Sequence, residues 1–310
     1  MKTQTSTKFS ALTTDLVLRT GSAMRAVCAI AILLAASAIG TAATCPPLPA
    51  GAIYPPSGTM VAWYSFDETA SPSVNLATQN NATWSGTLTP GPGEVAGAVD
   101  FSNGYMDAPD SIVSNFGPAG NATCPNGGDY STCQGDFSFD VWLKLDVLPN
   151  GNVNAIVDKR NGSEIGYSFY IYGSSSYFSG YPWIGVQLGD QAHSYTNYGS
   201  PALEPPLGNQ GNGLTVGTWH HVAVTVSRKS PGILWYFDGT LIPGSPTQIP
   251  TQTGTLLNNV PLSIGANGAA NSGGSNFLGS LDELQIFNRV LTAKEVESIY
   301  NARTHGQCKP

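Results

Sequence analysis

The pattern of apolar and polar positions is most regular near the end of the chain, over residues 278–287. Every second residue there falls on the same side of an extended backbone, and one such set is Leu278, Ser280, Asp282, Leu284 and Ile286. A period of two predicts a β-strand. Because Asp282 shares its set with aliphatic residues, we expect its carboxylate to point at least partly toward the interior.

A helix is predicted directly after this strand. Thr292 and Glu295 have the spacing of a capping box, in which each side chain bonds the backbone of the other residue. Val296, Ile299 and Tyr300 then fall on one helical face. The chain should therefore end in a strand followed by a short helix.

The same period of two predicts strands further upstream. Over residues 137–145 it gives an inward-facing set of Phe139, Val141, Leu143 and Leu145. Residues 218–239 indicate a hairpin at the centre of a sheet, with Asp238 and Gly239 turning the chain into one more short strand. Polar segments with little periodicity, at 69–93 and 193–213, are expected to be mostly loops.

Three stretches together resemble laminin-G-like domains of the concanavalin A-like jelly-roll class. The first stretch carries Phe66, Asp67 and Glu68, then Gly97, Ala98 and Phe101, then Tyr105, Pro109 and Asp110. The second carries Trp219, His221, Val222, Ala223, Tyr236, Asp238 and Gly239. The third carries Leu281, Asp282, Glu283, Asn288, Arg289, Leu291 and Thr292. The likeness extends over about residues 59–301.

This resemblance implies an all-β fold, an antiparallel two-sheet β-sandwich (jelly roll) with a short C-terminal helix. Composition agrees, because 36 glycines and only 11% charged residues suit many short strands joined by turns. Some laminin-G-like domains bind one calcium ion through carboxylates and backbone carbonyls. The resemblance points to Asp67 and Asp282 for such a site. The alternative is that Asp282 accepts hydrogen bonds from a tryptophan or a backbone N–H group.

Residues 1–43 are predicted to be an export signal. Met24 and Arg25 precede an apolar run that ends in small residues and is too short for a comfortable membrane span. Met24 is therefore an alternative start of the protein. We expect a secreted protein, extracellular or periplasmic, that is not inserted in a membrane once the signal is removed.

The remaining chain is predicted to hold a leader and one domain. Residues 44–58 are rich in proline and should be extended, and residues 59–310 should form the jelly roll. Cys45 offers a lipoprotein anchor as an alternative, but Thr44 is larger than the residue that usually precedes a lipidated cysteine.

Four cysteines follow the signal, and export to an oxidising compartment favours disulfides. Of the three possible pairings we favour Cys124–Cys133, which closes a loop rich in Gly, Asn and Asp, together with Cys45–Cys308, which ties the chain ends. Their irregular spacing argues against a zinc site.

Net charge narrows the choice of partner. The formal charge of the whole chain is −7, so its surface repels nucleic acid and anionic membranes. A neutral partner or a cation suits it better.

Aromatic residues concentrate between residues 167 and 198. We assign ligand binding to five of them: Tyr177, Tyr181, Trp183, Tyr195 and Tyr198. The four tyrosines lie in Gly-, Ser- and Asn-rich stretches and should be exposed. Flat rings beside amide side chains suit sugars, because sugar C–H groups pack on the ring while hydroxyls bond to polar neighbours. The alternative is that these rings only anchor loops.

Catalytic signatures are missing from the sequence. Glucanases of this sandwich class carry Glu-x-Asp-x-Glu on one strand, and this chain has no Glu-x-Asp. His220 and His221 are neighbours on a strand, so they face opposite sides and cannot hold one metal together. We predict a non-catalytic module that binds a glycan. The alternatives are a domain that binds extracellular protein or assembles at a surface, and a polysaccharide-active enzyme of the same fold.

Overall fold

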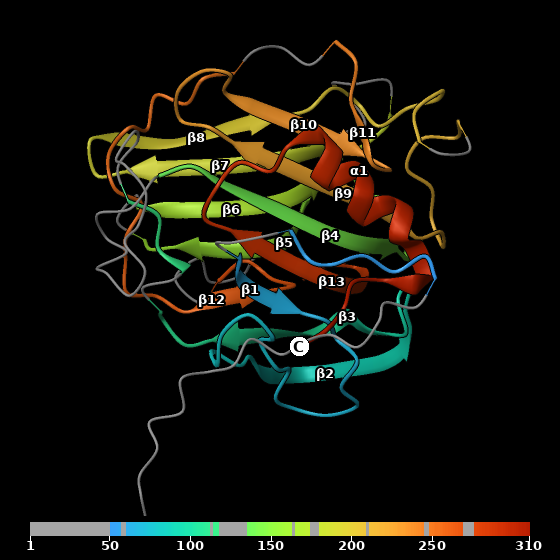
Figure 1. Ribbon diagram of the computed structural model, residues 1–310. Helices are drawn as coiled ribbons and strands as arrows, with labels where there is room; N and C mark the ends of the chain where they lie inside the picture. Colours follow the sequence, from blue (N-terminus) through green and yellow to red (C-terminus); the bar gives the residue numbers. More distant parts are fainter. Residues whose placement is uncertain are drawn as a thin grey trace, which may run out of the picture. The chain divides into compact units, whose positions relative to one another are not determined.

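Antiparallel β-strands make up most of the structure (Figure 1). The computed structural model describes residues 50–56, 60–111, 114–117, 135–162, 165–173, 180–208, 211–244, 248–268 and 276–310. The strands are β1 (Met60–Tyr64), β2 (Thr83–Pro92), β3 (Gly97–Ala108), β4 (Phe137–Leu145), β5 (Val153–Arg160), β6 (Gly166–Tyr172), β7 (Trp183–Asp190), β8 (His193–Gly199), β9 (His220–Val226), β10 (Ile233–Phe237), β11 (Thr240–Leu241), β12 (Leu262–Ile264) and β13 (Gly279–Phe287). Helix α1 (Ala293–Ala302) follows and continues into a 3-10 turn, Arg303–His305.

The strands form two facing layers. In hydrogen-bonding order one layer runs β11-β10-β9-β4-β13-β3 and the other runs β5-β6-β7-β8, and Figure 1 shows the second behind the first. Short β12 pairs with β3 on one side and with β5 on the other. β1 adds to β13, and β2 adds to β3. The all-β jelly-roll prediction is confirmed, with one difference: β12 joins the two predicted sheets into a single curled sheet.

Aromatic side chains from both layers fill the space between them. Phe139 of β4 stacks on Phe169 of β6 with ring centroids 5.1 Å apart, and Phe137 lies 5.7 Å from Tyr167. All four rings are fully buried. Since β4 and β6 are not neighbours in the sheet, these contacts hold the layers face to face. Burying each ring stabilises the fold by about 1.5–3 kcal/mol, and the inward side predicted for β4 is confirmed.

A β-bulge in β13 changes the alternation expected from the sequence. Glu283 has a φ of 53°, and the pairing of β13 with β4 shifts register between Asp282 and Gln285. The extra residue lets Leu281 and Leu284 both enter the inter-layer core. Asp282 therefore lies on the outer side of the sheet. The expectation that it shares a face with Leu284 is wrong, although its carboxylate is buried.

Helix α1 covers the outer face of the layer that contains β4, β9 and β10 (Figure 1). Val296 and Ile299 pack with Phe287 in a second, smaller apolar cluster. Tyr300 stacks on Trp142 of β4 with ring centroids 5.5 Å apart. In the part of the chain described here, no helix has the length and apolar content needed to cross a membrane.

The predicted capping box is present at the start of α1. The Thr292 side chain accepts a hydrogen bond from Glu295 N, and the Glu295 carboxylate accepts one from Thr292 N at 2.8 Å. Arg289 lies 2.7 Å from the same carboxylate. The hydrogen bonds from Arg289 and Thr292 lower the pKa of Glu295 to about 2.

Three local predictions differ from the structure. Residues 193–199 form β8 and residues 83–92 form β2, although both were expected in loops. Each pairs with a neighbouring strand, β7 or β3, so its backbone hydrogen bonds are satisfied by a partner that its own polar sequence does not reveal. The β9–β10 hairpin is confirmed, but it lies at one edge of its layer instead of the centre.

Replacing the cap residue should destabilise the protein. Thr292→Ala removes the acceptor for Glu295 N, so we expect the free energy of unfolding to fall by about 1 kcal/mol. Urea denaturation monitored by tryptophan fluorescence measures the loss. Thr251→Ala, at an exposed bend, is the control and should lie within about 0.5 kcal/mol of the parent. Equal losses in both variants would contradict the cap assignment.

Candidate functional site

The outer face of the layer β5-β6-β7-β8 carries a tryptophan beside two glycines. Trp183, the first residue of β7, packs against Gly185 of its own strand and Gly199 of β8, which pair directly with each other. A Cβ atom at Gly199 would come within 2.7 Å of the indole, and one at Gly185 would overlap the Tyr170 ring and come within 2.8 Å of the indole. The two glycines therefore leave room for these rings against the sheet, and the indole is half-buried.

Tyrosines and amides surround this ring. Tyr172 pairs with Trp183 across β6 and β7 with ring centroids 5.1 Å apart, and Tyr170 meets the indole edge-on at 5.8 Å. The Tyr170 hydroxyl donates to Asn197 Oδ1 at 3.1 Å, and Gln187 Nε2 donates to the same oxygen at 2.7 Å. Asn197 is exposed. These bonds fix its orientation beside the rings.

A buried ion pair continues the polar row. Arg160 donates to both oxygens of Asp158 at 2.8 and 2.7 Å, and also to Gln187 Oε1. Its guanidinium lies 5.6 Å from the centre of the Tyr195 ring. The Tyr195 hydroxyl donates to Asn161 O at 2.6 Å. We call the outward side chains of these four strands the aromatic face: Asp158, Arg160, Tyr170, Tyr172, Trp183, Gln187, Tyr195 and Asn197.

The structure separates the five predicted ligand residues. Trp183 and Tyr195 lie on the aromatic face, and Tyr181 is half-buried just before β7. Tyr198 is only 9% exposed and donates to Gln252 Oε1 at 2.7 Å, so the expectation of an exposed ring is wrong. Positions three apart on a strand face opposite sides, which puts Tyr198 opposite Tyr195. Tyr177 lies outside the described residues.

Sequence reasoning missed the other six members of the face: Asp158, Arg160, Tyr170, Tyr172, Gln187 and Asn197. Asn197 falls in the segment 193–213 that the sequence predicts as a loop. The usable signal was Gly185, two residues after Trp183, because a glycine on the same side of a strand leaves room for a neighbouring ring.

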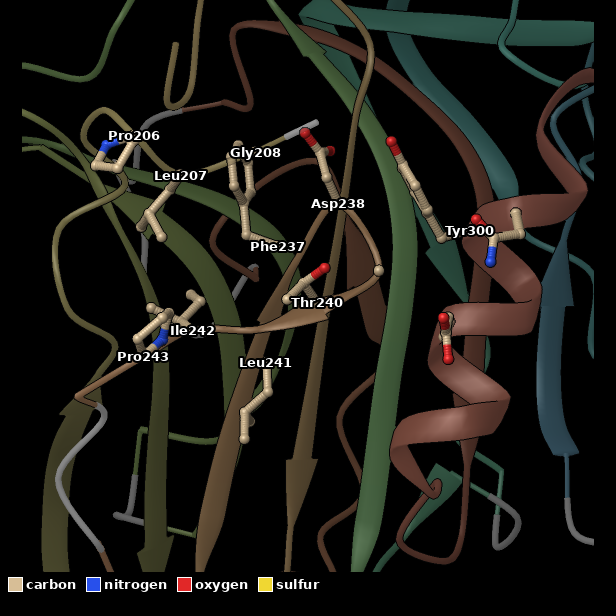
Figure 2. Close-up of a pocket in the computed structure, with 13 residues that line it drawn as sticks. Pro206, Leu207, Gly208, Phe237, Asp238, Thr240, Leu241, Ile242, Pro243 and Tyr300 are labelled. Carbon is tan, nitrogen blue, oxygen red and sulfur yellow. The ribbon is translucent and has the colours of Figure 1, made fainter. Parts of the chain in front are cut away.

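Two adjoining pockets open near the turn between β10 and β11, and Figure 2 shows the one lined by Thr240 and Tyr300. Their volumes are about 270 and 260 Å³, and they share Gly208 and Asp238. We call the two together the rim pocket. Figure 2 shows Leu207 and Ile242 on one side, Tyr300 of α1 on the other, and Asp238 between them. No sequence pattern predicts this pocket, because its walls come from distant segments.

The charged groups of the rim pocket are held in place. The buried Asp238 Oδ1 accepts from His221 N at 3.0 Å, and Asp238 Oδ2 lies 3.1 Å from His220 Nδ1. Glu94 and Arg303 form an ion pair of 2.8 Å at the same pocket. Burial raises the pKa of Glu94, while Arg303 opposes that rise.

The two histidines have different surroundings. His220 stacks on Phe237 with ring centroids 5.0 Å apart. His221 is fully buried, with Nε2 2.9 Å from Asp140 Oδ2 and its ring 5.2 Å from that of Trp142. The prediction that the neighbouring histidines do not form one metal site agrees with their separate carboxylate partners.

Two acidic residues contact the C-terminal tail. Lys309 Nζ lies 2.5 Å from Asp67 Oδ2 and 2.7 Å from Glu283 Oε1. Trp63 Nε1 donates to the other oxygen of Glu283 at 2.5 Å. An ammonium group of the chain itself is therefore paired with both carboxylates. Over the described ranges, no group of three or more His, Cys, Asp and Glu residues is arranged to hold a metal ion. Calcium at Asp67 and Asp282 stays a prediction.

Asp282 makes the backbone hydrogen bond foreseen as the alternative to calcium. It is fully buried, and its Oδ2 accepts from Val95 N at 2.8 Å. Burial, followed by the nearby charge of Glu283, raises the pKa of Asp282 well above its ordinary value. Asp67 adds to this shift, which places the two carboxylates within electrostatic reach of each other.

Cys308 is disulfide-bonded. The other cysteines of the predicted pairs, Cys45, Cys124 and Cys133, lie outside the described residues, so the pairing stays a prediction. The predicted signal, residues 1–43, also lies outside them.

The chain belongs to the laminin-G-like family described as the concanavalin A-like lectin/glucanases superfamily, whose family model matches residues 116–297. The resemblance inferred from the sequence is thereby confirmed. A search of curated proteins gave no match.

Solved structures show the same fold at low sequence identity. Domain 4 of AbnA, an extracellular arabinanase from Geobacillus stearothermophilus solved with arabinotriose, matches with a TM-score of 0.51 and 18% identity over 77% of this chain and 97% of that one. The binding domain of Paraclostridial Mosquitocidal Protein 1 matches with 0.55 and 15% over 79% and 52%. The binding domain of botulinum neurotoxin DC, solved with SialylT, matches with 0.51 and 14% over 79% and 51%. The chain spans about half the length of the two toxin domains.

Removing the tail ammonium should destabilise the fold. Lys309→Met leaves the buried Glu283 without its cation, so we expect a loss of about 2 to 3 kcal/mol at pH 7, because the partly exposed Lys309 makes the pair less costly to break than a fully buried one. Urea denaturation measures it. Adding Glu283→Gln should recover most of the loss, and Lys294→Met on the exposed side of α1 is the control. A free energy of unfolding that is the same in the Lys309→Met variant as in the parent would refute the role of the ion pair.

Asp282 should make stability depend on pH. Its pKa is raised in the folded state, so the folded protein binds this proton more tightly than the unfolded chain, and stability is lost as pH rises above the ordinary carboxyl value of 3.8. Asp282→Asn keeps an acceptor for Val95 N and cannot ionise. In calcium-free buffer, the melting temperature of the variant should rise relative to that of the parent between pH 4 and pH 8. A difference in melting temperature that stays constant with pH would contradict this.

Proposed function

We propose that this protein is a secreted, non-catalytic carbohydrate-binding module whose site is the aromatic face. One observation carries the proposal: the half-buried indole of Trp183 packs against Gly185 and Gly199 on the outer face of the layer, beside Tyr172 and Asn197. A sugar ring packs its C–H groups on such a surface.

The polar groups beside the indole suit hydroxyl recognition. Sugar hydroxyls both donate and accept, so they need neighbours of both kinds. Asn197 and Gln187 provide amide groups, and Arg160 orients Gln187 while Asp158 holds Arg160. Such a row, fixed by its own hydrogen bonds, reduces the ordering cost of binding. Tyr181, and Tyr177 in the segment before it, are proposed to extend the aromatic surface.

A binding role is favoured over catalysis by the state of the carboxylates. Glycoside hydrolysis needs one carboxyl group to protonate the leaving oxygen and another to attack or activate water. Asp158 is paired with Arg160, Glu94 with Arg303, and Asp238 accepts from a backbone N–H. Each is already engaged within the protein.

Charge, cysteines and structural neighbours support the proposed ligand, a neutral glycan, and the proposed location outside the cell. A chain with net charge −7 favours a neutral glycan. The arabinanase domain was solved with arabinotriose, and one toxin domain with SialylT, so this fold accommodates sugars on other proteins. The export signal expected at residues 1–43 and the disulfide at Cys308 support secretion.

Loss of the Trp183 indole should abolish most glycan binding. Trp183→Ala removes the stacking surface, and the lost ring contact of about 1 kcal/mol plus its buried area predicts at least about tenfold weaker binding. The measurement is calorimetric titration with a panel of purified neutral glycans that includes linear arabino-oligosaccharides. It is performed once with calcium and once with chelator, so that a metal requirement is detected.

Tyr54→Ala is the matched control, because it removes an aromatic side chain that is 60% exposed in the N-terminal segment. It should bind as the parent does. A panel that is blank in both buffers contradicts the sugar proposal and favours a protein partner, which capture from culture supernatant would then identify. Release of reducing ends from a polysaccharide would instead show catalysis.

A further inference from the structure

We propose that the rim pocket is a second sugar site, which holds one or two units of a neutral oligosaccharide. The inference rests on the proposed function for its class of ligand, but on other residues for its site. The aromatic face belongs to β5–β8, whereas the rim pocket is built by the β10–β11 turn, the segment before β9 and helix α1.

Two glycines bring the backbone against the walls of the rim pocket. A Cβ atom at Gly208 would lie 2.8 Å from the Phe237 ring and 2.9 Å from Asp238 Oδ2, and its φ of 83° disfavours any side chain. At Gly239, φ is 74° and a Cβ would lie 2.6 Å from the Tyr300 ring. Larger residues at these two positions would displace the walls, so the glycines preserve the shape of the pocket.

The walls match the two sides of a sugar ring. The apolar side is the 43% exposed Leu241, with Phe237 and Ile242 buried behind it at 2% exposure each, and C–H groups can pack against Leu241. Thr240 and the Tyr300 hydroxyl offer hydrogen bonds across from it (Figure 2). A ligand pocket of this mixed kind is the usual form of a small-molecule site.

The adjoining pocket adds an aromatic side chain and more polar groups. Trp219 is half-buried there, with Lys144 Nζ 5.0 Å from its ring centre. Thr215 Oγ1 lies 3.1 Å from His220 Nε2, and Asn212 is exposed at the rim. Each pocket lies just below the usual size range of ligand sites, about 300–1,000 Å³, so each suits one sugar unit. Both together suit two.

Charge selects a neutral ligand. Glu94, Asp238 and Glu297 line the rim pocket, and Arg303 is the cation among them. Arg303 is already paired with Glu94. Excess negative charge repels sulfate, phosphate and uronate groups, whereas neutral hydroxyls can donate to carboxylates. Two sites on different layers would also let one polymer chain bind twice, which raises avidity without a new contact.

Fluorine NMR of protein labelled with 5-fluorotryptophan tests the two sites separately. The chain has six tryptophans, and single substitutions assign the signals of Trp183 and Trp219. The probes are neutral trioses of arabinose, xylose and glucose, and one uronate triose. We expect a neutral triose to shift the Trp219 signal, also in Trp183→Ala. Thr240→Tyr, which fills the pocket from an exposed position, should weaken that response at least about tenfold.

Thr251→Ala is the control, because this exposed residue lines neither pocket. The response should persist in it. If no neutral triose shifts the Trp219 signal while the Trp183 signal does shift, the rim site is refuted and the aromatic face is supported. A response of Trp219 alone would refute the aromatic face and support the rim pocket. An equal response to the uronate triose would contradict the charge argument.

Discussion

Stacking of aromatic rings between the two layers is the contact on which the rest of the structure depends. Phe137 and Phe139 of β4 meet Tyr167 and Phe169 of β6, although these strands are not neighbours in the sheet. This packing buries the inner faces of both layers, so they cannot contact a ligand. Recognition is therefore left to the outer faces and to the edges.

The two outer faces are completed in different ways. One is covered by α1 and the C-terminal tail, and the charges buried there find partners within the chain, as Glu283 does with Lys309 and Trp63. The other, on β5–β8, keeps half-exposed rings and amides at its surface. Covering the first face stabilises the layer, while leaving the second open provides a place for a ligand.

Glycine shapes both candidate sites, but by different means. At Gly185 and Gly199 the missing side chain leaves room for the Trp183 indole against the sheet. At Gly208 and Gly239 the backbone takes a positive φ and comes directly against the aromatic walls of the rim pocket. In both places the approach is set by the backbone, so it does not have to be formed when a ligand arrives.

Elements whose signals are local can be predicted from the sequence alone. The alternation in β4, the capping box at Thr292 and the turn at Asp238 each depend on residues a few positions apart, and the family pattern added the class of fold.

Other features needed contacts between distant residues. The bulge at Glu283 is held by Trp63, 220 positions away, and β8 is a strand because β7 pairs with it. Tyr198 became a core residue and Tyr195 a surface residue for the same reason, since pairing and layer packing decide which side of a strand is inside. Periodicity reports only which residues share a side. Which side is buried, and which distant segments meet to form a pocket, is decided by the tertiary structure.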